Sequence, residues 1–211
     1  MRTFSVTWDY RCPFARNVNE HVVDGLLAGA DWDVTFVPFS LGQVQLAEGE
    51  PPIWDRPGDD SGLLALEVGT TVRDLKPARF PAVHRDLFAV RHDLGGDLRD
   101  AGLLRDVLDR HGVDTDAVFA QVDDGRALKT VRMAHERAAT DHNVWGVPTF
   151  ISGDQAVFIR LMHRPEGAGG RRRAGDRGGD GDTSVAHIER MLDLMDGFAD
   201  LNEFKHTSIP R

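Results

Sequence analysis

The one cysteine in this 211-residue chain, Cys12, is the residue whose type and setting indicate chemistry. Pro13 follows it, and proline is favoured in the first turn of a helix, so we expect the thiol at a helix N-terminus. Unpaired backbone N–H groups and the positive end of the helix dipole lie at such a position. Because a helix N-terminus can lower a thiol pKa from about 8.5 to roughly 3.5–7.5, the spacing predicts a nucleophilic thiolate.

The neighbours of Cys12 leave a second interpretation open. Cysteine is often buried as a small apolar residue, and Cys12 could have only that packing role. A buried Asp9 carboxylate near the sulfur would raise the thiol pKa, whereas Arg11 would lower it. Because the sequence does not give the directions of these two side chains, only the helix-end effect on the thiol pKa has a defined sign. Since the chain has one cysteine, any disulfide must join Cys12 to another molecule.

Apolar periodicity predicts the elements that position Cys12. Alternation at residues 4–8 and 32–37 predicts two strands, and an apolar stripe at residues 14–26 predicts a helix between them that ends near Gly29. A strand, a helix and a strand in this order form a βαβ unit with parallel strands and a right-handed connection. Cys12 therefore lies where the first strand passes into the helix.

The middle of the chain is predicted to be helical. An irregular connection at residues 43–59 precedes a series of amphipathic stripes that continue to about Thr140. Strand character returns at residues 149–151 and 156–161, joined by a type II′ turn at Gly153-Asp154. A last helix is predicted from Thr183 or Ser184 onward.

Two separated motifs, DYRCPF at residues 9–14 and WGVPTF at residues 145–150, carry a resemblance to a known family. Together with the order of elements, they resemble the DsbA-like branch of the thioredoxin superfamily over nearly the whole chain. The resemblance implies an α/β, thioredoxin-like fold with a central mixed sheet and an inserted helical subdomain. Residues 1–42 and 144–205 would form the thioredoxin-like domain, with a mobile loop at 163–183 that includes a solvated arginine run, and residues 60–142 would form the inserted subdomain.

The family fold also implies that the Val147–Pro148 peptide bond is cis and lies beside Cys12. Pro148 has no N–H, so Val147 can present its backbone groups to an extended partner chain while the proline ring limits access to the sulfur. A proline can also simply start a strand. Trp8 and Phe14 fit core positions, so Tyr10 and Trp145 are expected to make exposed contacts. The predicted substrate-binding residues are Tyr10, Pro13, Phe14, Trp145, Val147 and Pro148.

Ala15 stands where the usual motif of the family has its second cysteine. Without a resolving thiol, Cys12 would stop at a mixed disulfide until an outside thiol released it. We therefore expect a DsbA-like thiol oxidoreductase with Cys12 as catalytic nucleophile and a low-molecular-weight thiol as co-substrate. The resemblance extends to kappa-class glutathione transferases and 2-hydroxychromene-2-carboxylate isomerases, in which the reactive sulfur belongs to a cofactor. A non-catalytic thioredoxin-like binding module is the remaining alternative.

Composition narrows the class of partner. The net charge of −9 disfavours binding to nucleic acid, and no apolar run is long enough to cross a membrane. We expect a cytoplasmic protein that can form a homodimer. Its substrate would be a thiol or a disulfide, either a small molecule or an extended peptide, and it would hold no tightly bound cofactor. His135 and His142 lack the spacing of a recognised metal motif, so no metal site is predicted.

Overall fold

The computed structural model describes residues 1–165 and 180–200. Four strands form one mixed sheet in the order β2-β1-β3-β4. Strands β1 (Arg2–Trp8) and β2 (Trp32–Pro38) are parallel, whereas β3 (Thr149–Ser152) and β4 (Gln155–Phe158) continue the sheet as antiparallel neighbours. The predicted α/β fold with a central mixed sheet is confirmed.

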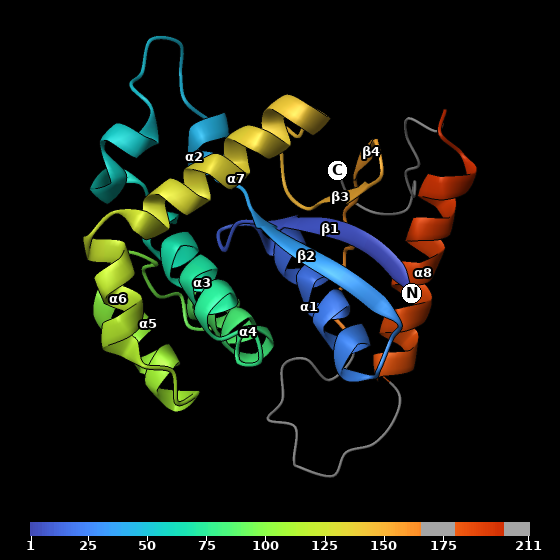
Figure 1. Ribbon diagram of the computed structural model, residues 1–211, viewed down its shortest axis with the longest axis horizontal. Coiled ribbons are helices and arrows are strands. Elements are labelled where there is room, and N and C mark those ends of the chain that lie inside the picture. Colours follow the sequence, from blue (N-terminus) through green and yellow to red (C-terminus); the bar gives the residue numbers. More distant parts are fainter. Residues whose placement is uncertain (166–179, 201–211) are drawn as a thin grey trace.

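The helix α1 (Pro13–Leu27) connects β1 to β2, as the sequence predicts. Val18 and Val22 from its apolar stripe are fully buried, together with Val6 and Trp8 of β1. The C-terminal helix α8 (Asp180–Gly197) packs alongside α1 (Figure 1). These buried residues of β1 and α1 belong to one continuous core that also includes residues of the segment between β2 and β3.

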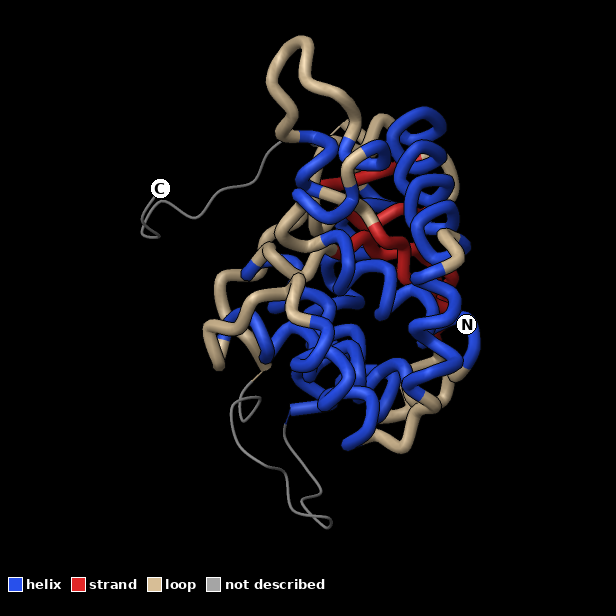
Figure 2. Tube along the Cα trace, turned by 90° about the vertical axis from the view of Figure 1, so that its left-hand side faces the viewer, coloured by secondary structure: helices blue, strands red, loops and turns tan. Residues whose placement is uncertain are grey.

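The segment between β2 and β3 is largely helical and lies beside the sheet (Figure 1). Figure 2, turned by 90°, shows the strands confined to one part of the molecule with helices around them. Asp100 and Asp114 cap two of these helices by accepting hydrogen bonds from backbone N–H groups in the first turn. The elements are α2 (Leu41–Val44), two 3₁₀ turns (Ile53–Asp55 and Pro57–Asp59), α3 (Leu63–Leu75), α4 (Phe80–His92), α5 (Ala101–Arg110), α6 (Thr115–Asp123) and α7 (Arg126–His142).

Two boundaries differ from the sequence prediction. Strand β4 ends at Phe158 rather than at residue 161, because its partner β3 begins at Thr149, which is paired with Phe158. Helix α8 begins at Asp180, so the prediction of a loop is wrong for residues 180–183. Gly181 makes this early start possible, since a Cβ there would lie 2.6 Å from Cβ of Ala28 at the end of α1. The arginine run at 171–173 lies outside the described residues.

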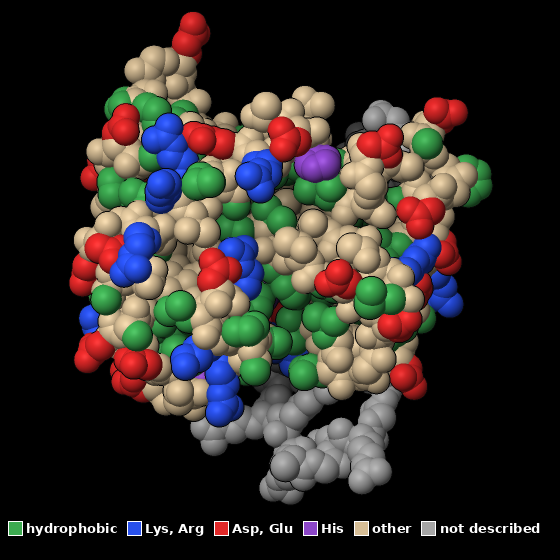
Figure 3. Space-filling model, viewed as in Figure 1, with side chains coloured by type: hydrophobic (Ala, Val, Ile, Leu, Met, Phe, Trp, Pro, Cys, Tyr) green, Lys and Arg blue, Asp and Glu red, His purple; other side chains and the backbone are tan. Residues whose placement is uncertain are grey.

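The surface mixes charges of both signs. Figure 3 shows acidic and basic side chains interspersed over one face of the molecule. In the described part of the chain, every helix is too short or too polar to cross a bilayer.

The pH dependence of the free energy of unfolding should reveal the ionisation of Glu67, a buried carboxyl group on α3 that is only 5% exposed. Burial raises the pKa of Glu67 to about 7, so the folded state holds its proton at pH values where the unfolded chain has lost it. Glu67 therefore lowers stability as the pH rises from about 4.3 towards 7, by at most roughly 3 kcal/mol.

We expect the neutral isostere Glu67→Gln to match the wild type at pH 4.5 and to become the more stable protein above pH 7. Urea unfolding at both pH values measures the difference. The control Glu136→Gln, which changes an exposed glutamate paired with Arg132, should show no such trend. A difference that does not change with pH would contradict the assignment.

Candidate functional site

Cys12 lies at the N-terminus of α1, as the sequence predicts. It is the N-cap residue, with extended backbone, and its Sγ accepts a hydrogen bond from the N–H of Ala15 at 3.4 Å. The Cys12 N–H donates to the carbonyl of Asp9 at 3.0 Å, which closes the turn between β1 and α1. The sulfur is therefore fixed at the amide end of the helix by backbone contacts on both sides.

The second motif, WGVPTF at residues 145–150, contacts the first motif at the Cys12 sulfur. The Val147–Pro148 peptide bond is cis, and the Cys12 thiol donates to the carbonyl oxygen of Val147 at 3.4 Å. The N–H of Thr149 donates to the side-chain oxygen of Thr7 in β1 at 2.8 Å, which holds the proline loop against the strand that leads to Cys12. Residues 135 positions apart in the sequence are thus adjacent at the site.

The pKa of the Cys12 thiol is raised, contrary to the sequence prediction of a thiolate. Burial is the largest cause, because Cys12 is only 9% exposed and the charged form loses hydration. The backbone N–H groups of Ala15 and Phe14 lower the pKa, as expected for a helix end, and the charge of Arg160 does the same. The carboxylate of Asp9 adds to the increase. The predicted helix-end effect exists, but desolvation outweighs it.

Asp9 anchors the turn that carries Cys12. Its fully buried carboxylate accepts hydrogen bonds from the Arg11 N–H at 2.9 Å, from Arg11 Nη2 at 2.6 Å and from the Leu41 N–H at 2.8 Å. Arg11 Nη1 reaches Asp60 at 3.0 Å. Gly62 leaves room for this arginine, since a Cβ there would lie 2.6 Å from Arg11 Nε. The network joins the Cys12 turn to the start of the inserted helices.

Tyr10 lies in the core, so the prediction of an exposed substrate contact is wrong for this residue. Its side chain is fully buried, and its hydroxyl is 2.8 Å from His84 Nδ1. His84 Nε2 lies 3.2 Å from Asn19 on α1, and burial lowers the pKa of His84 to about 3, so its ring is neutral. Tyr10 lies in the turn that the Cys12–Asp9 hydrogen bond closes, and its ring points inward, where it packs against Trp8, His84 and Phe88.

The other predicted contact residues lie around the thiol. Pro13 is exposed, Phe14 is half-buried, and Trp145 is 64% exposed. Val147 and Pro148 are buried, so Val147 meets the sulfur through its carbonyl rather than through its side chain. Trp8 is in the core, as expected.

The structure adds Phe158 and Arg160 to the site. The Ile159 N–H donates to the carbonyl of Pro148 at 3.2 Å, which places the end of β4 beside the proline loop. Arg160 lies over the rings of Phe14 and Phe158, at 5.3 and 5.4 Å from their centroids. The Trp145 and Phe158 centroids are 4.6 Å apart. We call Trp145, Phe158, Arg160 and Phe14 the rim of the site.

The comparisons with known proteins agree with this geometry. The model of the family described as DSBA-like thioredoxin domain matches residues 5–162. The chain belongs to this family. It is 26% identical over 165 residues to Rv2286c, an uncharacterised protein of Mycobacterium tuberculosis, with 78% of this chain and 70% of that protein covered. The predicted membership of the DsbA-like branch is confirmed.

Solved structures share the fold of this DSBA-like protein. Pseudomonas aeruginosa DsbA has a TM-score of 0.56 at 16% identity, with 94% of this chain and 86% of that chain covered. BdbD from Bacillus subtilis has a TM-score of 0.55 at 18% identity, with 90% and 87% covered. A 2-hydroxychromene-2-carboxylate isomerase has a TM-score of 0.60 at 16% identity, with 95% and 100% covered.

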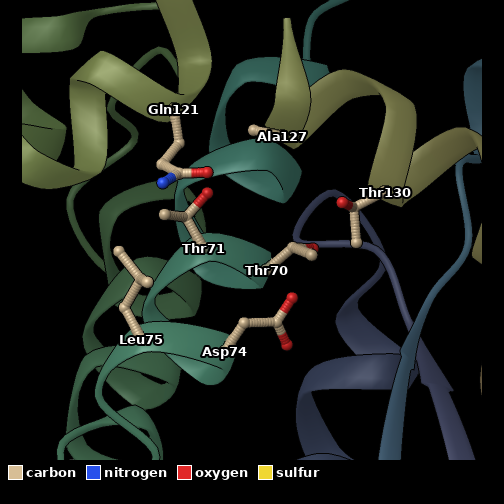
Figure 4. A pocket seen from close by; sticks show the side chains of 7 residues that line it. All are labelled: Thr70, Thr71, Asp74, Leu75, Gln121, Ala127 and Thr130. Carbon is tan, nitrogen blue, oxygen red and sulfur yellow. The ribbon is translucent and has the colours of Figure 1, made fainter.

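A small pocket lies within the inserted helices of this DSBA-like protein. Its volume is about 40 Å³, and Figure 4 shows residues from α3, α6 and α7 around it. That volume holds on the order of two or three water molecules, so the pocket is too small for a substrate. Within residues 1–165 and 180–200, no three His, Cys, Asp or Glu side chains are grouped as metal ligands would be. The pocket is lined by Thr70, Thr71, Asp74, Leu75, Gln121, Ala127 and Thr130.

Replacing Asp9 by alanine should destabilise the protein by roughly 2–4 kcal/mol, because Arg11 would remain largely buried without its main partner. Asp97→Ala is a matched control, since Asp97 also pairs with an arginine two residues later, Arg99, but both side chains are exposed. Little change in stability is expected there. Chemical denaturation measures both variants, and equal effects would show that the Asp9 network does not anchor the turn.

The rate of Cys12 alkylation should increase with pH throughout the neutral range. Because burial raises the thiol pKa, the thiolate fraction, and with it the rate, grows about tenfold per pH unit between pH 6 and 8. Intact-mass measurement of the iodoacetamide reaction tests this, with Cys12→Ser as the blank. A rate that levels off below pH 7 would contradict the raised pKa.

Proposed function

We propose that this DSBA-like protein is a monothiol oxidoreductase that exchanges disulfides through Cys12. The observation that carries the proposal is the contact of one thiol with two elements, the amide end of α1 and the carbonyl of Val147. The amide end stabilises the thiolate that attacks, and the proline loop presents backbone groups to the molecule that is attacked. Ala15 in place of a second cysteine restricts the exchange to one protein sulfur.

The reaction proceeds in two exchanges with an outside thiol as co-reactant. The Cys12 thiolate attacks one sulfur of a disulfide, forms a mixed disulfide and releases the other half as a thiolate, which takes up a proton. A low-molecular-weight thiol, as its thiolate, then attacks the mixed disulfide, leaves with the bound half as a new disulfide and returns Cys12. The sum is one disulfide and one thiol converted into another disulfide and another thiol.

The raised pKa of Cys12 affects the two exchanges differently. Few molecules are ionised at neutral pH, but each thiolate is a stronger nucleophile because nucleophilicity increases with pKa. A thiol of high pKa is also a poor leaving group, so release of Cys12 is slow. We infer that the mixed disulfide is a long-lived state that persists until the outside thiol arrives.

Incubation with bis(hydroxyethyl) disulfide followed by intact-mass measurement tests the proposal. One adduct per chain should form, remain after removal of the reagent, and disappear when a reducing thiol is added. Cys12→Ser should form none, and Ala15→Cys should lose the adduct without an added thiol, because a neighbouring cysteine resolves it. An unmodified thiol after prolonged incubation at pH 8.5 would exclude thiol exchange.

A cofactor-dependent activity is the second candidate. The protonated thiol of Cys12 can donate a hydrogen bond, and together with the Ala15 N–H it could hold the thiolate of a bound thiol cofactor. The match that covers 95% of this chain to the 2-hydroxychromene-2-carboxylate isomerase favours this reaction type. Isomerase activity that requires an added thiol and survives in Cys12→Ser would support it. Peptide binding without adduct formation or isomerisation would instead indicate a binding module.

A further inference from the structure

The rim beside Cys12 holds a cation that faces solvent. Arg160 is exposed, and its charge lowers the pKa of the Cys12 thiol, so it acts electrostatically on the reacting sulfur. Within the residues that the structure describes, no carboxylate lies at ion-pair distance from its guanidinium group. In contrast, the Asp9 carboxylate near the sulfur is buried and bonded to Arg11. An approaching molecule therefore meets the positive charge of Arg160 beside the sulfur.

The guanidinium group is held in place by aromatic rings. Arg160 lies over both Phe14 and Phe158, and these two cation–π contacts support its guanidinium group, whose geometry suits a planar acceptor. Phe158 belongs to β4, and the Ile159–Pro148 hydrogen bond fixes the end of that strand beside the proline loop. Because Phe14 lies two residues after Cys12, both supports of the cation are tied to the elements that hold the sulfur.

The remaining rim surface is apolar. Trp145 is 64% exposed, and its ring packs against Phe158, so it extends the aromatic surface from Arg160 along the proline loop. A large exposed ring of this kind offers an apolar contact to a bound carbon chain. A positive, planar donor and an apolar surface thus lie next to one thiol.

On the basis of the function proposed above, we propose that Arg160 selects the substrate of Cys12: a small disulfide or thiol that carries a carboxylate near its sulfur. The carboxylate pairs with the guanidinium group, and the carbon chain lies against Trp145 and Phe158. The choice of a small molecule follows from the closeness of cation and sulfur on a buried site, where Cys12 is only 9% exposed. Arg160 is a specificity residue that contacts substrate, and it is distinct from the nucleophile.

Paired reagents of equal size separate this proposal from the function on which it rests. Iodoacetate carries a carboxylate where iodoacetamide carries a neutral amide of similar size, and both alkylate the same thiolate, so the fraction of ionised thiol cancels in the ratio of their rates. Compared with a cysteine in an unstructured peptide, Cys12 should favour iodoacetate by about fivefold at low salt. The preference should vanish in Arg160→Gln and persist in part in Arg160→Lys. Arg132→Gln, which removes an exposed arginine on α7, should leave it unchanged.

The same variants are then compared in disulfide exchange. Dithiodiglycolate should react faster than bis(hydroxyethyl) disulfide, and cystamine should react slowest, with the order lost in Arg160→Gln. A preference for iodoacetate without any disulfide adduct would contradict the exchange function and support the anion site. Exchange with all three reagents at equal rates would overturn the role of Arg160 and leave the exchange function standing. A neutral peptide disulfide that reacts faster than dithiodiglycolate would overturn the small-molecule substrate, and a thiol that no reagent modifies would overturn both proposals.

Discussion

The site depends on one buried charge, the carboxylate of Asp9. Burying a carboxylate is costly unless its oxygens are bonded, and here two backbone N–H groups and the Arg11 guanidinium group fulfil that need. Each of these bonds fixes a separate segment: the Cys12 turn, the start of α2 and, through Asp60, the entrance to the inserted helices. The thiol is held in its place because few other conformations of the turn would keep these hydrogen bonds to the carboxylate. The same negative charge raises the thiol pKa, so rigidity at the site is obtained at the expense of thiolate.

The reactivity of Cys12 is set by the balance between burial and directed hydrogen bonds. The helix end supplies N–H groups that favour the thiolate, and the carbonyl of Val147 favours the protonated thiol, because it can only accept. Burial adds to the second effect and decides the direction. In the proposed exchange, a sulfur in this setting is rarely ionised but is a strong nucleophile when it is, and it is a poor leaving group. Under that proposal, a chain with one cysteine would keep the mixed disulfide until another thiol arrives.

The proposed role of Arg160 would let an acidic protein bind an anion. The chain carries a net charge of −9, which repels anions at long range, but salt screens that field within about 10 Å. Close to the sulfur, the proposed anion would instead meet Arg160, which lies over two aromatic rings. Trp145 and Phe158 supply the apolar surface next to it. The local charge at the site can therefore be positive although the net charge of the molecule is negative.

The sequence by itself determined the order of elements, the mixed sheet, the helix start at Cys12 and the family, because apolar periodicity, the Cys-Pro pair and the WGVPTF motif are local patterns. Only the tertiary structure decided three further points. Tyr10 turned inward because His84, far along the chain, offered its hydroxyl a partner in the core. Phe158 and Arg160 joined the site because a strand end met the proline loop. The thiol pKa rose rather than fell, since desolvation depends on everything that packs around the sulfur. Local spacing specifies where a helix begins, but burial is a sum over neighbours that the fold alone brings together.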